Sequence, residues 1–282
     1  MKNLIKKIRF YLNMSQTEFA EHMNVSFATV NRCENGRAVP NKLAQMRLHE
    51  LCKARAVPVY DMTLEKIAEA AEKIEAVHGK VLLYHGSKSG IEGVIEPKSR
   101  KQCDFGRGFY MGTDRTQPLT LICNYPKAKI YTLSVDLSEL KILDVEVGLD
   151  WALLVAYNRG KLDSVKSTKI YNRFVELSKG CDMIIGYIAN DRMFVVLDRF
   201  FNGEITDLAL IHSLSALNLG KQYAALTEKA CKKIKIIEEQ EISEYDRDKL
   251  KRLSEVKRSE GIAKAEEICR KYRREGQFFD EI

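Results

Sequence analysis

Apolar residues in the first sixty positions recur at the three- and four-residue spacing that is typical of helices. The run at 2–12 places its apolar side chains on one helical face. The segment from Ser15 to Glu18 has the form of a capping box, which predicts the start of a second helix. Asn24 is expected to end that helix, because asparagine tolerates a left-handed backbone.

Two further helices are expected before residue 60. Ser26 is expected to begin the third helix, which should end near Asn35 and Gly36. Pro40 and Asn41 precede the fourth. Its apolar positions are Leu43, Met46, Leu48 and Leu51. The N-terminal part of the chain is therefore predicted to be a set of short helices joined by short turns.

From residue 81 the pattern changes to short runs of β-branched and aromatic residues, which predict strands. In chain order the runs are VLLYH, GFYMG, IYTLSVDL, KILDV, DMIIGYIA, RMFVVLD and KQYAALTEKACKKIKII. Helical patterns lie between and after them, including a charged stretch at 243–275. This mixture predicts an α+β domain. The expected organisation is a helical domain at 1–60, a helical linker at 61–80, an α+β domain at 81–237 and a charged helical extension at 238–282.

Positive charge is concentrated at the start of the chain. Residues 1–60 hold ten Lys and Arg against four Asp and Glu, a net charge of +6, whereas the whole chain of 282 residues carries +7. A polyanionic partner is therefore expected for the first domain alone.

The seven cysteines are scattered and form no C-x-x-C pair, which argues against a zinc site or a disulfide framework. Reduced cysteines indicate the cytoplasm. No apolar run is long enough to cross a membrane, so no membrane partner is expected, and the basic N-terminus does not read as a signal peptide.

The segment MSQTEFAEHMNVSFATVNRCENGRAVP has the pattern of a helix-turn-helix. Ala20 is small enough for two helices to cross closely, and Val25 and Val30 fill the space between them. The stretch from Glu34 to Gly36 ends the second helix of this motif, which is the third helix expected in the chain. This segment resembles the lambda-repressor-like (Cro-type) DNA-binding family over residues 1–56.

The resemblance implies a recognition helix that begins at Ser26 and binds the protein's own operator as a homodimer. Arg32 can reach guanine, and Phe27 and Ala28 can contact a thymine methyl group. Gln16, on the preceding helix, would contact a phosphate or a base. The expected DNA-binding residues are Gln16, Ser26, Phe27, Ala28, Asn31 and Arg32. The alternative is that this fold serves protein contact alone.

Three familiar site types do not fit the second domain. DFG is found in kinases, but no H-R-D loop or glycine-rich nucleotide loop accompanies it here. GRGFYMG is not the dinucleotide-binding fingerprint, and no helical pattern follows it. The five histidines are too scattered for a metal site.

LYHGS, GRGFYMGTD and KQYAALTEKACKKIKII follow one another in an order that resembles the ADP-ribosyltransferase superfamily. The resemblance is to the branch with a His-Tyr-Glu constellation, and more specifically to an uncharacterised bacterial family marked by YHGS, DFGxGFY and QY…TEKA. It implies that NAD is the substrate. The implied NAD-binding residues are His85, Gly86, Ser87, Asp104, Gly108, Phe109 and Tyr110.

The chemistry of NAD cleavage fits these residue types, because the reaction passes through a sugar cation. His85 would bond a ribose hydroxyl, and Tyr110 would cover the nicotinamide ring. Gly86 would leave the backbone bare enough to grip the carboxamide, which Ser87 could also reach. The expected catalytic residues are His85, Tyr110 and Gln222.

Gln222 departs from the pattern, because the resembled branch has a glutamate there. An amide carries no negative charge and cannot act as a base. Three carboxylates are candidates to replace it: Glu228, Asp104 and Asp191. Tyr125 is the nearest option for a second ring-stacking tyrosine, and Arg192 is a candidate for the pyrophosphate.

Three hypotheses follow. The first is an ADP-ribosyltransferase that modifies a protein or nucleic acid and carries a DNA-binding domain. Bacterial proteins with this pairing resemble toxin–antitoxin or phage-defence components, so an antitoxin partner is possible. The second is a catalytically silent NAD or ADP-ribose sensor that controls a repressor, which Gln222 favours. The third is a repressor whose second domain serves dimerisation.

Overall fold

The computed structural model describes residues 2–59, 62, 79–162, 169–188, 193–216, 220–272 and 275–281. The chain divides into two compact units. The first comprises residues 1–77 with 242–249, and the second comprises residues 78–241 with 250–282. Of the helical linker expected at 61–80, residues 61 and 63–78 lie outside the described residues. None of the helices in the described ranges has the length and apolar character needed to cross a membrane.

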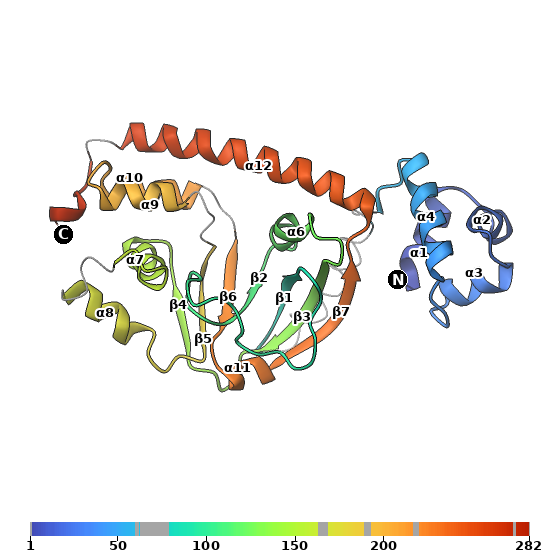
Figure 1. Ribbon diagram of the computed structural model, residues 1–282, viewed down its shortest axis with the longest axis horizontal. Helices are drawn as coiled ribbons and strands as arrows, with labels where there is room; N and C mark the ends of the chain where they lie inside the picture. Colours follow the sequence, from blue (N-terminus) through green and yellow to red (C-terminus); the bar gives the residue numbers. More distant parts are fainter. Residues whose placement is uncertain are drawn as a thin grey trace. The chain divides into compact units, whose positions relative to one another are not determined.

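The first unit begins with four helices (Figure 1): α1 (Lys2–Tyr11), α2 (Gln16–Met23), α3 (Phe27–Glu34) and α4 (Lys42–Ala54). The capping expectations are confirmed. The Ser15 side chain accepts a hydrogen bond from the Glu18 N–H within a complete capping box, and the Ser26 side chain caps α3 by accepting from the Thr29 N–H. Asn24 ends α2 with φ of 53°, in the left-handed region.

The core of this unit lies between the four helices and includes Phe19, Ala20 and Val30. Helices α2 and α3 follow one another across a short turn, which is compatible with a helix-turn-helix. On α4, Leu48 and Leu51 pack against the core. Leu43 and Met46, two of the expected apolar positions, are instead each 55% exposed.

A buried ion pair joins the first and third helices. Arg9 donates from Nε to one Glu34 oxygen at 2.6 Å and from Nη2 to the other at 3.2 Å. Gln16 donates from Nε2 to the same carboxylate at 2.7 Å. Burial by itself would raise the pKa of Glu34, but the hydrogen bonds from Arg9 and Gln16 outweigh it and hold that pKa below its ordinary value.

The second unit is built on a seven-stranded mixed sheet in the order β4-β5-β6-β2-β1-β3-β7. Within it, β4 and β5 pair in parallel and the other neighbours pair antiparallel. The strands are β1 (Lys80–Ser87), β2 (Phe109–Gly112), β3 (Lys129–Asp136), β4 (Ile142–Val145), β5 (Met183–Tyr187), β6 (Lys221–Ala225) and β7 (Ile234–Glu241). The α+β expectation is confirmed.

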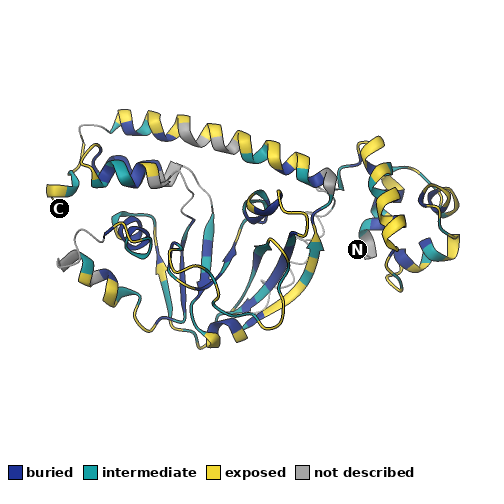
Figure 2. Cartoon of the chain, in the orientation of Figure 1, coloured by how far each residue is buried: buried dark blue, intermediate teal, exposed yellow. Residues whose placement is uncertain are grey.

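Each face of the sheet is covered by a different layer. One carries a cluster that includes Trp151, Phe174, Phe200 and Leu210, from α7 to α10. The other packs strand residues against loop side chains such as Ile91, and against α11. Strands at the middle of the sheet are largely buried, whereas β7 is largely exposed (Figure 2). The helices are α6 (Thr116–Ile122), α7 (Leu149–Asn158), α8 (Lys169–Leu177), α9 (Met193–Phe201), α10 (Asp207–Ala216), α11 (Glu228–Lys232) and α12 (Glu244–Lys271), with a 3-10 turn at Phe279–Glu281.

Two strand predictions were wrong. The RMFVVLD segment contributes to helix α9, in which Val196, Leu197 and Phe200 are buried and Val195 is exposed. That spacing is helical. The segment from 221 to 237 is not one strand but β6, α11 and the start of β7. The break occurs because the Thr227 side chain caps a helix by accepting from the Ala230 N–H.

Candidate functional site

His85 lies where β1 separates from β2. Among the residues that the structure describes, β1 pairs with β2 at one position, Tyr84 with Gly112. By contrast, β1 pairs with β3 at eight positions. The His85 side chain bridges the separation, with Nδ1 2.7 Å from the Tyr110 carbonyl oxygen. Because a carbonyl oxygen only accepts, Nδ1 carries the proton. Burial lowers the pKa of His85, so the ring is neutral and Nε2 is an acceptor.

The predicted catalytic residues are divided between the two faces of the sheet. The His85 ring stacks on Phe109, with centroids 4.2 Å apart. Phe109 and Tyr110 are adjacent on a strand and therefore point to opposite faces. Tyr110 pairs with Ala224, and Gln222 is two residues along the same strand, so Tyr110 and Gln222 share a face. The structure brings Tyr110 and Gln222 together and places His85 on the other side.

On the face of Gln222, a buried polar network joins the side chains of Asp104 and Gln222 to that of the half-buried Arg159. Gln222 Nε2 lies 2.7 Å from Asp104 Oδ2 and 3.2 Å from the Tyr187 carbonyl oxygen. Both partners only accept, which fixes the orientation of the amide. Arg159 donates to Asp104 Oδ1 from Nε at 2.7 Å and also from Nη2. A carboxylate therefore lies directly beside the Gln222 amide.

The loop that carries Asp104 is fixed by Tyr110 and Phe105. The Tyr110 hydroxyl donates to the Gly106 carbonyl at 2.7 Å and accepts from the Phe105 N–H at 3.0 Å. Burial raises the pKa of Tyr110, which keeps that hydroxyl protonated. The buried Phe105 ring lies against Gly186 on β5 and near Trp151. A Cβ at Gly186 would come within 2.6 Å of that ring.

Three of the expected NAD-binding residues have roles inside the fold. A Cβ at Gly86 would lie 3.1 Å from the Pro118 carbonyl oxygen, so the glycine lets α6 pack closely on β1. The Ser87 hydroxyl donates to the Gly90 carbonyl at 2.8 Å and closes the turn after β1. Gly108 is crowded by β6, because a Cβ there would lie 3.0 Å from the Ala225 carbonyl oxygen. Their contact with NAD stays a prediction.

The other candidates are spread more widely. Glu228 is exposed on α11 and lies 4.0 Å from Lys232. Tyr125 is 39% exposed, and Lys88 lies over its ring at 4.5 Å, close to the end of β1. Asp191 and Arg192 lie outside the described residues. Of the two candidate carboxylates that lie in the described residues, Asp104 is the one that accepts a hydrogen bond from Gln222.

In the first unit, the outer face of α3 presents Phe27, Ala28 and Arg32 to solvent. Asn31 is half-buried, and its side-chain oxygen accepts from Asn35 Nδ2 at 2.8 Å. Ser26 is engaged as the cap of α3. The Gln16 amide donates to Glu34 as described above. Among the expected DNA-binding residues, the exposed side chains that do not cap a helix are therefore those of Phe27, Ala28 and Arg32.

Comparison with protein families gives one match. The family is described as a protein of unknown function (DUF3990), and its model covers residues 81–236, more than half of the chain. The chain belongs to the DUF3990 family. The DUF3990 region contains every member of the buried polar network and also His85. It does not contain the helices of the first unit. Neither a curated protein nor a solved structure matches the chain significantly.

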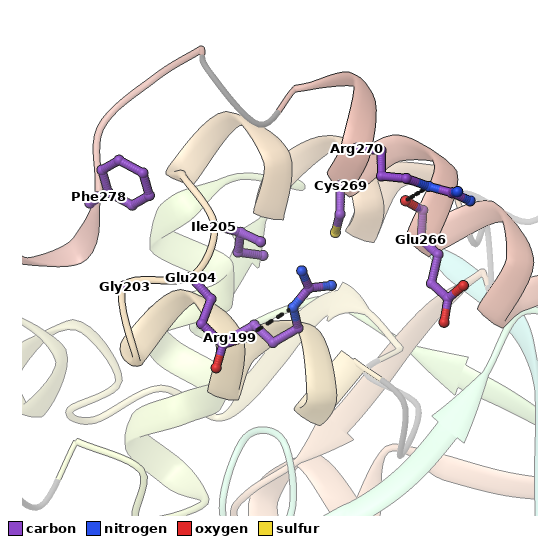
Figure 3. Close-up of a pocket in the computed structure, with 8 residues that line it drawn as sticks. All are labelled: Arg199, Gly203, Glu204, Ile205, Glu266, Cys269, Arg270 and Phe278. Carbon is purple, nitrogen blue, oxygen red and sulfur yellow. Dashed lines mark hydrogen bonds and ion pairs between the residues drawn. The ribbon is translucent and has the colours of Figure 1, made fainter.

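A separate pocket of about 770 Å³ lies where the end of α9 and the turn after it face the C-terminal part of α12 (Figure 3). It is lined by Arg199, Gly203, Glu204, Ile205, Glu266, Cys269, Arg270 and Phe278. It shares no residue with the polar network. Within this pocket Arg199 forms an ion pair with Glu204 at 3.3 Å. The lining residues therefore carry charges of both signs. The polar network is therefore the stronger candidate site.

Sequence reasoning missed Arg159 and Phe105. Arg159 is 55 positions from Asp104 and belongs to no motif. The signal for Phe105 was available in β5, because Gly186 pairs with Gln222. A glycine inside a strand marks a place where another group approaches closely. Gly186 therefore indicates that something packs beside Gln222.

Proposed function

We propose that residues 81–237 form an ADP-ribosyltransferase-type domain that binds NAD and transfers ADP-ribose to a protein or nucleic-acid target. The observation that carries this proposal is the buried Asp104 carboxylate, held 2.7 Å from Gln222 on the same face as Tyr110. A carboxylate stabilises the sugar cation that forms when the nicotinamide bond breaks. The order of the HGS, GxGFY and QY motifs also supports the proposal.

In the proposed reaction, the bond between the ribose C1′ and the nicotinamide nitrogen breaks. The nitrogen keeps the electron pair, and neutral nicotinamide leaves. A nucleophile on the target then forms a bond to C1′ and gives up its proton. Gln222 and Asp104 would face the ribose. His85 lies on the other side of the sheet and would act as a positioning residue, through the hydrogen bond that joins it to the Tyr110 carbonyl oxygen.

We propose that the first unit binds DNA as a homodimer through the outer face of α3 and controls the protein's own operon. A cytoplasmic toxin–antitoxin or phage-defence role would fit this combination. The concentration of positive charge in residues 1–60 and the exposure of Arg32 support DNA binding.

Arg32→Ala is expected to abolish discrimination at one base position, at a cost of about 1–3 kcal/mol for the preferred operator. Binding to operator variants, measured at one salt concentration, tests this expectation. Lys53→Ala, which removes an exposed charge from α4, is the control and should leave base preference unchanged. A uniform loss of affinity on all sequences with Arg32→Ala would show that Arg32 contacts phosphate alone.

The principal test of the enzyme proposal is release of nicotinamide from NAD by the full-length protein. Wild type should release nicotinamide, and both Asp104→Asn and His85→Ala should reduce the rate. Glu228→Gln removes an exposed carboxylate from the same domain and should leave the rate unchanged. Melting curves of each variant separate loss of chemistry from loss of fold. Absence of release from wild type, with cell extract supplied as target, would contradict the proposal.

The alternative is a silent NAD or ADP-ribose sensor, and Gln222→Glu separates it from the enzyme. A sensor that lacks only the glutamate charge should gain nicotinamide release. The structure favours the opposite result, because the Gln222 amide donates to Asp104 and to the Tyr187 carbonyl. A glutamate there would lose both hydrogen bonds and face a second carboxylate. We therefore expect Gln222→Glu to lower release and to lower the melting temperature.

A further inference from the structure

Two aromatic side chains stand exposed at the end of α1. Phe10 is 61% exposed and Tyr11, the last residue of this helix, is 54% exposed. A single exposed apolar residue needs no explanation, but adjacent aromatic rings at one helix end form a patch that marks an interaction surface. Lys6, one helical turn before Phe10, is exposed beside them. We call Lys6, Phe10 and Tyr11 the α1 patch.

The Phe10 ring is held in place by two cations. The guanidinium carbon of Arg9 lies 4.6 Å from the ring centroid, and Lys6 Nζ lies 5.8 Å from it. Arg9 is itself fixed by its two hydrogen bonds to Glu34 and by a third from Nη1 to the Met14 carbonyl oxygen at 2.9 Å. Because the ring is already ordered, its binding to a partner would cost little further side-chain entropy.

Two observations indicate that the partner of the α1 patch is a polyanion. The patch carries the exposed charge of Lys6 and lies in the part of the chain whose net charge is +6. It is also connected to the start of α2, because the Glu34 carboxylate that holds Arg9 accepts a hydrogen bond from Gln16 as well. In a helix-turn-helix, the first helix of the motif crosses the DNA backbone while the second enters the major groove.

We propose that the α1 patch binds the sugar–phosphate backbone of double-stranded DNA, outside the base pairs that α3 would read. Lys6 neutralises a phosphate, the Tyr11 hydroxyl donates to a phosphate oxygen, and the Phe10 ring packs against a deoxyribose. Such contacts position a protein on the duplex and carry no sequence information. This inference rests on the proposed DNA binding for its partner. It assigns affinity to α1 and leaves the choice of sequence to α3.

The test is titration of the full-length protein against two labelled duplexes, one selected for tight binding and one with the same bases scrambled, at several salt concentrations. Phe10→Ala should bind both duplexes about tenfold more weakly than wild type, and Tyr11→Phe about threefold more weakly. Neither variant removes a charge, so the salt dependence should not change. Lys6→Gln should reduce the salt slope by about one. Met46→Ala removes an apolar side chain that is 55% exposed on α4 and should bind as wild type does.

Melting curves show whether each variant is folded, and the conservative Tyr11→Phe decides the test if Phe10→Ala is not. A loss confined to the selected duplex would overturn the inference, because it would mean that the patch reads bases. Sedimentation without DNA gives a second check: a change of oligomeric state in Phe10→Ala would assign the patch to a second copy of the chain. If wild type binds DNA and both aromatic variants bind equally well, the inference alone falls. If wild type binds neither duplex, the DNA-binding proposal falls with it.

Discussion

Replacing Glu34 with alanine is expected to lower the free energy of unfolding of the first unit by about 3 kcal/mol. The Glu34 side chain is 3% exposed and accepts from Arg9 and Gln16. Its removal leaves the Arg9 guanidinium, which is 10% exposed, without its counter-charge. Hydrogen–deuterium exchange of residues 2–59 in the full chain measures the effect on this unit alone.

The matched control is the double variant Arg9→Met with Glu34→Leu, which replaces the pair by apolar side chains and should recover most of the lost stability. The depressed pKa of Glu34 also gives a pH dependence. Its contribution is complete above the ordinary glutamate pKa of about 4.3 and is lost as the pH falls through the lower pKa of the folded state. Unchanged exchange in Glu34→Ala, or a double variant as unstable as the single one, would contradict this account.

Gly186→Ala is expected to destabilise the second unit by about 1–3 kcal/mol, because the added Cβ would overpack the site. It would lie 2.6 Å from Phe105 Cζ and 3.2 Å from Trp151 Cδ1. Alanine is otherwise better than glycine inside a strand, so backbone preference alone predicts the opposite sign. The chain has one tryptophan, and it lies at this position, so its fluorescence reports denaturant unfolding of this unit.

Gly112→Ala is the matched control, because Gly112 pairs with Gln222 from the other neighbouring strand. A Cβ there meets its nearest atoms at 3.8 Å or more, which is ordinary contact. We expect a change within about 0.5 kcal/mol. Adding Phe105→Leu to Gly186→Ala should restore part of the loss. Equal effects of Gly186→Ala and Gly112→Ala would show that Phe105 does not fill the space above Gly186.

The ends of the N-terminal helices could be predicted from sequence because the responsible interactions are local. Ser15, Asn24 and Ser26 each act within a few residues of their position. The strands β1 to β5 also followed from their apolar runs. The run in RMFVVLD misled because five apolar residues fit a buried strand or a buried helix equally well. The 221–237 segment misled because Thr227 was not recognised as a cap.

The candidate site was less predictable because its contacts are long-range. The motifs located Tyr110, Gln222 and Asp104, but the Gln222 bond to Asp104 spans 118 positions. Whether His85 shares a face with Tyr110 depends on strand register, and a shift of one residue reverses the answer. Arg159 has no signal of its own, since an arginine after a helix is ordinary.

Each unit has its own set of buried cysteines, whose reaction with an alkylating reagent would report when that unit opens. Cys33 and Cys52 are buried in the first unit, and burial raises the pKa of Cys52 to about 12. The second unit buries a separate set: Cys123, Cys181, Cys231 and Cys269. Protonated, buried thiols react only when their surroundings open. Pulsed alkylation followed by peptide mass analysis would therefore time the opening of each unit within one intact chain, with half-buried Cys103 as the early-reacting reference.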